Sequence, residues 1–206
     1  MGKAVNHSET RQQILQAALR RFANNGYAAA SVQQIVDDAQ VSKPALYYYF
    51  KDKAGLFQAL VDEAHDQRYR LMQSAVAAAR DLRSQLTGIL TSLFGYLHEN
   101  RELMRIAFAT AFAAPGEVPA DLCYLDKCER NFEVVHTLFK QALAGGELDR
   151  RFDSRELAFG FYGQAHFYIV SHLMMPKYRL DRRAAERIVD LFLLGAGAKK
   201  GKRARL

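Results

Sequence analysis

The chain has 206 residues, of which half are hydrophobic and a quarter are charged, with a formal net charge of +7. This length allows one large or two small domains with a real core, and the composition is that of a soluble globular protein. The polar N-terminus and the short apolar runs predict no signal peptide and no membrane-spanning segment, so we expect a cytoplasmic protein without a membrane partner.

The positive charge is unevenly distributed along the chain. Residues 1–54 hold seven Lys or Arg against four Asp or Glu, whereas residues 199–206 hold five basic residues and no acidic one. We expect residues 199–206 to be a disordered basic tail that aids solubility, with nonspecific attraction to DNA as the alternative. The high isoelectric point is therefore a weak argument for DNA binding, and the charge on residues 1–54 is a better one.

The residues before Ser31 predict one supporting helix. Ser8 or Thr10 can cap it, and we expect it to run to about Asn24 and to end at the Asn24-Asn25-Gly26 sequence. Its apolar stripe consists of Ile14, Ala18 and Phe22, widened by Leu15 and Leu19.

The stretch from Ser31 to Phe50 predicts two short helices with a tight turn between them. Ser31 and Gln34 have the spacing of a capping box, and Ser42 can cap the second helix. Leu46 and Phe50, four residues apart, can point inward together. Two helices joined in this way form a helix-turn-helix, whose second helix fits the major groove of DNA.

Three consecutive tyrosines, Tyr47–Tyr49, give this second helix its chemical character. Successive side chains on a helix lie about 100° apart, so the three phenols cannot all be buried on one face. An exposed phenol can donate to a phosphate oxygen, and Lys43 and Lys53 supply positive charge on either side. The pattern favours DNA binding over the alternative, a small three-helix unit with a tyrosine-rich surface.

After Phe50 the sequence predicts helices throughout, without an alternating pattern long enough for a strand. Asp52 can cap a helix that continues to about Arg80. Further helices are expected near residues 82–99, 101–113, 119–144, 154–174 and 181–195. The chain is therefore predicted to be all-α, with a three-helix DNA-binding domain at 8–54 and a larger helical domain at 55–198.

The segment from Phe159 to Leu173 carries apolar side chains on all sides of its expected helix. Because such a helix is buried all round, we expect one side to face its own core and the other a second copy of the chain. The last expected helix also has more than one apolar face. We predict a homodimer through a four-helix interface, with a monomer of large internal core as the alternative. The interface candidates are Phe161, Tyr168, Ile188 and Phe192.

Residues 8–60 resemble the N-terminal domain of the TetR/AcrR family of bacterial transcriptional regulators. The resemblance is carried by Ile14-Leu15-Gln16-Ala17-Ala18, Phe22, Gly26-Tyr27, Ser31-Val32, Ile35, Ala39, Val41-Ser42-Lys43, Leu46-Tyr47-Tyr48-Tyr49-Phe50, Lys53 and Leu56-Phe57. The chain departs from the family pattern at Ala30, where Thr is frequent, and at Gln40, where the turn usually carries Gly. Gln40 is strained if that position needs a positive φ.

This resemblance implies a dimer that sets two recognition helices on a palindromic double-stranded operator, one helical turn apart. It implies base-edge or groove-floor contacts from Gln33, Lys43, Ala45 and Tyr47, and phosphate contacts from Ser31, Tyr48, Tyr49 and Lys53. Ser42 and Pro44, at the start of the second helix, complete the candidate DNA-binding set.

The resemblance also implies a pocket in the second domain for a small hydrophobic or aromatic effector, whose binding lowers the affinity for DNA. The candidate lining residues are Phe94, His98, Met104, Phe108, Phe112, Tyr124, Phe132, His136, Tyr162 and His166. We therefore expect a repressor that the effector releases. The alternatives are a ligand-independent DNA-binding protein of the same fold and an activator.

Motifs for catalysis and metal binding are missing from the sequence. It contains no Gly-x-Ser-x-Gly, no P-loop, no His-Glu-x-x-His and no Cys-x-x-Cys. Cys123 and Cys128 would point about 140° apart on a helix and should neither bridge nor share a metal. We expect two free thiols, with redox sensing as the less favoured alternative, and no enzymatic activity, cofactor or metal ion.

Overall fold

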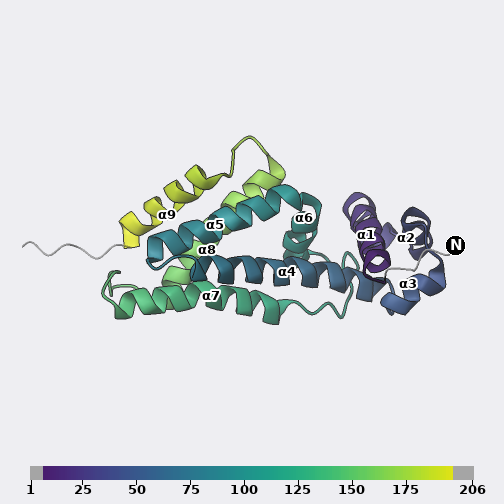
Figure 1. The fold of residues 1–206 in the computed structure, drawn as a ribbon, viewed down its shortest axis with the longest axis horizontal. Coiled ribbons are helices and arrows are strands. Elements are labelled where there is room, and N and C mark those ends of the chain that lie inside the picture. Colours follow the sequence, from purple (N-terminus) through teal and green to yellow (C-terminus); the bar gives the residue numbers. More distant parts are fainter. Residues whose placement is uncertain (1–6, 197–206) are drawn as a thin grey trace, which may run out of the picture. The chain divides into compact units, whose positions relative to one another are not determined.

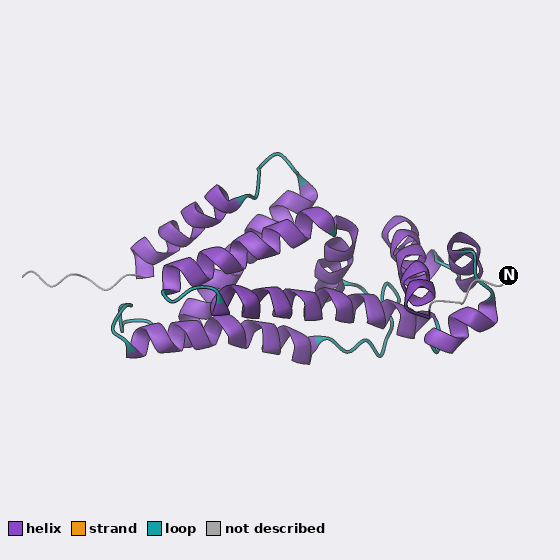
Figure 2. Cartoon of the chain, in the orientation of Figure 1, coloured by secondary structure: helices purple, strands orange, loops and turns teal. Residues whose placement is uncertain are grey.

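A computed structural model describes residues 7–196, which form helices joined by turns and loops (Figures 1 and 2). The helices are α1 (His7–Ala29), α2 (Val32–Ala39), α3 (Lys43–Tyr49), α4 (Lys53–Ala77), α5 (Leu82–Glu99), α6 (Arg101–Ala109), the 3₁₀ turn η1 (Thr110–Phe112), α7 (Leu125–Ala144), α8 (Ser154–Met174) and α9 (Arg182–Ala196). The described residues contain no strand, so the predicted all-α class is confirmed. None of these helices combines the length and the apolar character that crossing a bilayer requires. The predicted basic tail lies outside the described residues.

The chain divides into two compact units. The first contains the residues up to Asp66 together with Asn100–Lys127, and the second contains Gln67–Glu99 together with the residues from Cys128 onward. These limits differ from the predicted boundary at residue 55. One reason is that α6 packs against α1, where the Arg105 guanidinium donates to the Ala23 carbonyl at 2.6 Å, so the segment after α5 belongs to the first unit.

A shared apolar core holds α1, α2, α3 and the start of α4 together in the first unit. Its buried members include Ile14 and Phe22 from α1, Ile35 from α2, Leu46 from α3 and Phe57 from α4. The rings of Phe22 and Phe57 lie 5.3 Å apart between centroids in an edge-on arrangement. The long first helix is interrupted at Gly26, which has φ 75° and ψ 166°, close to the predicted end of that helix. A glycine adopts this conformation without a steric penalty.

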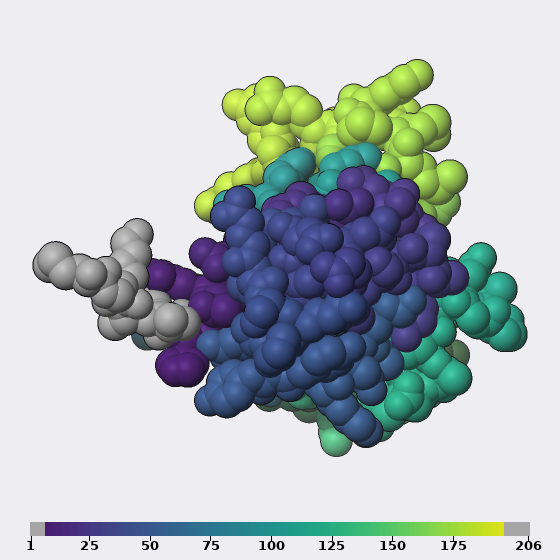
Figure 3. Space-filling view, turned by 90° about the vertical axis from the view of Figure 1, so that its right-hand side faces the viewer, coloured from purple at the N-terminus to yellow at the C-terminus, as the bar shows by residue number. Residues whose placement is uncertain are grey.

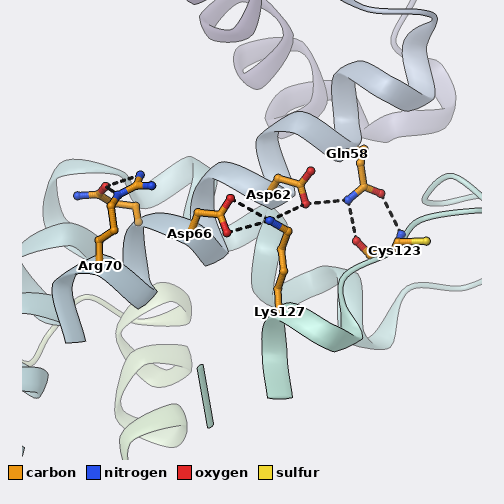
Figure 4. A network of polar contacts seen from close by, with 7 residues as sticks. Gln58, Asp62, Asp66, Arg70, Cys123 and Lys127 are labelled. Carbon is orange, nitrogen blue, oxygen red and sulfur yellow. Dashed lines mark hydrogen bonds and ion pairs between the residues drawn. The ribbon is translucent and has the colours of Figure 1, made fainter. Parts of the chain in front are cut away.

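The segment between η1 and α7 is irregular, although the sequence predicted a helix from residue 119. In Figure 4 the Gln58 side chain pairs with the backbone of Cys123, donating to its carbonyl at 2.7 Å and accepting from its N–H at 2.9 Å. Nearby, the ammonium of Lys127 lies 2.8 Å from Asp66 and 3.5 Å from Asp62. The Gln58 side chain thus satisfies backbone groups that a longer helix would have paired itself, so the predicted helix was wrong for residues 119–124.

In the second unit, α5, α8 and α9 pack against one another. The predicted span of α8 is confirmed, and so is its predicted start. The Asp153 carboxylate accepts from the N–H groups of Arg155 and Glu156, and the Glu156 side chain accepts from the Asp153 N–H. The sequence therefore specifies this helix end through a complete capping box.

Two of the four residues predicted for the dimer interface are buried within the subunit. Phe161 is 1% exposed and Ile188 is 2% exposed. The ring of Phe161 packs against those of Phe139 and Phe192, with centroids 5.9 and 5.4 Å away, so its own chain covers it. These two residues therefore offer almost no surface to a second copy. The exposed apolar side chains of α8 and α9 are Phe159, Phe167, Tyr168, Met174, Leu191 and Leu194.

Candidate nucleic-acid interface

The turn between α2 and α3 is fixed by side-chain caps and one left-handed residue. Ser31 Oγ accepts from the Gln34 N–H at 3.2 Å while Gln34 Oε1 accepts from the Ser31 N–H at 3.1 Å, which confirms the capping box. Ser42 Oγ accepts from the Ala45 N–H at 3.3 Å, so Ser42 caps α3 as predicted. Gln40 has φ 54° and ψ 42°, the left-handed conformation in which a non-glycine residue is strained.

One side of α3 is buried and the other is exposed. Leu46 is fully buried and Phe50 nearly so, whereas Tyr47 and Tyr48 are 50% and 72% exposed, and Tyr49 is half-buried. The exposed side also carries Ser42, Lys43 and Pro44, with Ala45 at its edge. These residues belong to the N-terminal surface, coloured purple and blue in Figure 3. The predicted inward and outward directions of α3 are confirmed.

The phenols on this surface are held by ring contacts. Tyr48 and Tyr49 form a T-shaped pair with centroids 5.0 Å apart. His7, at the start of α1, places Nδ1 2.9 Å from the Tyr49 hydroxyl, and its ring lies 5.8 Å from that of Tyr48. We did not single out His7 from the sequence, because nothing in the spacing from residue 7 to residue 49 indicates that the two meet.

Lys53, a predicted phosphate contact, has hydrogen-bond partners within the first unit. Its ammonium donates to the backbone carbonyls of Tyr27 at 2.8 Å, Ala30 at 3.0 Å and Ala28 at 3.4 Å. The same group lies 4.3 Å from the centre of the Tyr27 ring. Three carbonyls use the three donors of an ammonium, so Lys53 holds the last turn of α1 and the adjoining Ala30 in place. A direct phosphate contact from Lys53 requires these hydrogen bonds to break.

The acidic residues of α2 are compensated within the unit. The Arg21 guanidinium donates to both carboxylate oxygens of Asp38 at 2.6 Å, and this hydrogen bonding holds the pKa of Asp38 below its usual value. Gln33, a predicted base contact on the exposed side of α2, donates to Asp37 at 2.7 Å. These pairs reduce the repulsion that free carboxylates would exert on a phosphate backbone.

The ten predicted pocket residues do not gather in one unit. Met104, Phe108, Phe112 and Tyr124 belong to the first unit and the other six to the second. Phe112 is 84% exposed, whereas Phe94 and Met104 are buried core residues. Tyr124 lines an open hollow of about 740 Å³ beside the start of α4, whose walls carry charged residues including Asp62 and Lys127.

In the second unit, predicted pocket residues surround an arginine that we did not single out from the sequence. Arg68 on α4 is 9% exposed and interacts electrostatically with Tyr162, His166 and Cys128. Burial lowers the pKa of His166, and the charge of Arg68 lowers it further. Burial also raises the pKa of the Tyr162 phenol. The ring centroids of Phe132 and Tyr162 are 5.8 Å apart, so an apolar ring lies close to the tyrosine that interacts with Arg68.

The remaining candidate histidines have structural partners. His136 lies 2.9 Å from the Ser154 hydroxyl and 3.1 Å from Glu133, and the ring of His98 stacks edge-on against His172 at 5.1 Å. Cys123 and Cys128 are free thiols, as predicted. Across residues 7–196, no cluster of three or more His, Cys, Asp or Glu is arranged to hold a metal ion.

Residues 14–60 match the model of a family described as bacterial regulatory proteins, tetR family. The HTH-type transcriptional activator FasR of Mycolicibacterium smegmatis is 29% identical over 121 residues, 59% of this chain and 55% of FasR. The HTH-type transcriptional regulator TtgR of Pseudomonas putida is 39% identical over 67 residues, 32% of each chain. The chain thus spans about half the length of the first curated relatives it matches. These relatives are transcriptional regulators and not enzymes.

Solved structures show the same fold. The transcriptional regulator FadR from Bacillus subtilis, in complex with stearoyl-CoA, superimposes with a TM-score of 0.76 at 20% identity, over 89% of this chain and 98% of that one. The fatty acid degradation regulator FadR from Bacillus halodurans gives a TM-score of 0.78 at 20% identity, over 98% and 99% of the two chains. At this identity the likeness concerns the fold alone.

Proposed function

We propose that this chain, a DNA-binding transcriptional regulator that belongs to the tetR family of bacterial regulatory proteins, is a repressor that a small effector releases from a palindromic operator. The observation that carries the proposal is the two-sided α3, with Leu46 buried and the adjacent phenols exposed. A short helix capped at its start and anchored by one core residue presents a fixed surface to a major groove. The protein would act in the bacterial cytoplasm, which contains the DNA that it binds.

The exposed side of α3 supplies the two kinds of contact that binding to a duplex needs. Lys43 can donate to guanine acceptors in the groove, and Tyr48 can donate to phosphate oxygens. Ser31 and Ser42 keep their hydroxyls engaged as helix caps, so their part is to fix where α2 and α3 begin. The residues that contact base edges are therefore Lys43, Ala45 and Tyr47. Gln33 joins them when its side-chain amide donates to a base instead of to Asp37.

Homodimer formation is supported by the uncovered apolar surface of α8 and α9. Phe167 is 71% exposed and Leu194 is 84% exposed, and monomeric proteins rarely leave such a group of side chains in water. A twofold interface there would use Phe159, Phe167, Tyr168 and Leu191 in place of the buried Phe161 and Ile188. Light scattering at micromolar concentration tests this: we expect a dimer, and a monomer refutes it.

The effector that we propose combines an apolar body with a polar or anionic group. Phe132, Tyr162 and Met72 provide apolar surface in the second unit, and the Tyr162 hydroxyl lies 3.9 Å from the sulfur of Met72. Arg68, largely buried beside them, supplies positive charge that an anionic group can meet. The FadR of Bacillus subtilis, which shares the fold, binds stearoyl-CoA, a ligand of this chemical type.

Activation is the second candidate for the sign of regulation, because FasR, a relative matched over 59% of this chain, is a transcriptional activator. A reporter gene behind the recovered operator separates the two signs. Repression predicts that deletion of the protein raises expression, and activation predicts the opposite.

Selection of bound duplexes from a random library, with the full-length protein, tests DNA recognition. We expect enrichment of a palindrome whose half-sites lie about 10 base pairs apart, or a multiple of that spacing. The selection is then repeated with stearoyl-CoA and with uncharged apolar compounds of similar size. If no sequence is enriched, the proposed operator binding is refuted. If enrichment is the same with and without every compound, the proposed release by an effector is refuted.

A further inference from the structure

The beginning of α1 and the end of α3 meet at the surface through a polar contact. His7 Nδ1 and the Tyr49 hydroxyl are 2.9 Å apart, and the imidazole also lies 5.8 Å from the Tyr48 ring, tilted by 40°. His7 is exposed, Tyr48 is 72% exposed and Tyr49 is half-buried. An ionisable ring thus lies within the surface that the proposed function assigns to DNA.

The direction of this hydrogen bond depends on the protonation of His7. When Nδ1 is unprotonated it can only accept, so the Tyr49 O–H must donate to it. When the ring is protonated, Nδ1–H donates to the Tyr49 oxygen, and the phenolic hydrogen becomes free to turn toward another acceptor. The second ring nitrogen, Nε2, carries a hydrogen as well. From the neutral tautomer with its hydrogen on Nε2, protonation therefore adds a positive charge and releases the Tyr49 O–H as a donor, whereas from the tautomer with its hydrogen on Nδ1 it adds only the charge.

A phosphate oxygen is the acceptor that fits these donors. Charged hydrogen bonds to phosphate are about twice as strong as neutral ones. The charged residues closest in sequence to His7 and Tyr49 are Glu9 and Arg11 on α1 and Lys51 and Asp52 after α3. Among the described residues, none of these four forms an ion pair with the imidazole. Arg11 instead lies 5.3 Å from the centre of the Phe50 ring.

We propose that His7 and Tyr49 form a proton-linked donor pair on the DNA-binding surface, and that a duplex phosphate draws a proton onto His7. This inference rests on the proposed DNA binding. Because the complex holds the proton more tightly than the free protein does, affinity for DNA rises as pH falls through the range in which histidine titrates. Each His7 that takes up a proton contributes up to a tenfold gain in affinity per pH unit.

The test uses the full-length protein and a labelled random-sequence duplex of about 40 base pairs, because phosphate contacts do not depend on sequence. Binding is measured by fluorescence anisotropy from about pH 8 to pH 5.5 at fixed ionic strength, the range in which histidine titrates. His7→Gln keeps a hydrogen-bonding side chain but cannot take up the proton, and Tyr49→Phe removes the hydroxyl. His98→Gln is the matched control, since His98 is an exposed histidine of the second unit.

We expect His7→Gln to bind like the wild type near pH 8 and about three- to tenfold more weakly near pH 6. Tyr49→Phe should lose part of the same gain, and His98→Gln should keep all of it. A wild-type slope in His7→Gln, or an equal loss in His98→Gln, overturns the proposal.

A second measurement follows the His7 ring directly by proton NMR, with and without the duplex. The midpoint of its titration should move to higher pH when DNA is added. An unmoved midpoint overturns the proton linkage even if the duplex binds, whereas an absence of binding at every pH overturns the proposed function itself.

Discussion

Replacement of Lys53 by methionine separates a positioning role from a phosphate contact. The ammonium donates to Tyr27 and Ala30 at 2.8 and 3.0 Å, and each such charged hydrogen bond contributes about 1.5–3 kcal/mol. The contact with the Tyr27 ring adds about 0.5–1 kcal/mol. Because Lys53 is only half-buried, water can reach the released carbonyls, and we take half of the lower bound of this sum, about 2 kcal/mol of lost stability.

The assay is thermal unfolding of the full chain combined with the salt dependence of DNA binding. A loss of about 2 kcal/mol lowers the unfolding midpoint by about 4–8 °C for a chain of this size. A positioning residue leaves the salt slope unchanged, whereas each lost phosphate contact reduces it by about 0.9.

Lys51→Met is the matched control, because Lys51 is exposed and lies two residues from Lys53. We expect its unfolding midpoint to stay at the wild-type value. If Lys53→Met melts like the wild type and its salt slope falls by about one, the ammonium binds DNA and the positioning role is refuted.

Three further predictions follow from local geometry. Gln40→Gly should stabilise the chain by about 1 kcal/mol in urea titrations, because glycine tolerates the positive φ at this turn; a lower midpoint would contradict the strain. Tyr48→Ala should weaken operator binding in a gel shift without changing stability, whereas Leu46→Ala should lower stability by about 2–5 kcal/mol; equal stability losses would reject the assigned sides of α3. His166 has a pKa below its ordinary value, so below about pH 6.5 the unfolded chain binds more protons than the folded chain does. The stability of the wild type should therefore decrease below that pH, and the decrease should be smaller in His166→Gln. If stability depends on pH in the same way in both proteins, His166 does not cause the decrease.

The sequence specified the local features of the first unit well. Capping signals at Ser31 and Ser42 are satisfied by atoms three residues away, so spacing alone reveals them. The inward direction of Leu46 and Phe50 follows from helical periodicity in the same way. Gln40 does have a positive φ, which is the condition under which the departure from the family's glycine produces strain. These predictions succeeded because the residues that determine each feature lie within about one helical turn of it in the sequence.

The predictions that failed depend on partners distant in sequence. The helix expected from residue 119 was prevented by Gln58, which takes up the backbone of Cys123 from 65 residues away. Phe161 and Ile188 read as interface residues because an all-round apolar helix does not reveal which side its own chain covers. Likewise, sequence spacing did not distinguish which of the aromatic residues predicted for a pocket line it and which are buried in the core.

The candidate DNA-binding surface therefore combines a local part with a non-local one. A helix of seven residues such as α3 is too short to be stable alone in water, so the rest of the first unit must hold it. Leu46 anchors it from within, the Ser42 cap fixes its first turn, and His7 contacts its last turn. Because His7 is exposed and Leu46 is buried, loss of the His7 contact should change affinity for DNA without unfolding the unit, whereas loss of the Leu46 side chain should do both. Of these three supports only His7 carries an ionisable side chain, so it is the support through which pH can act on α3.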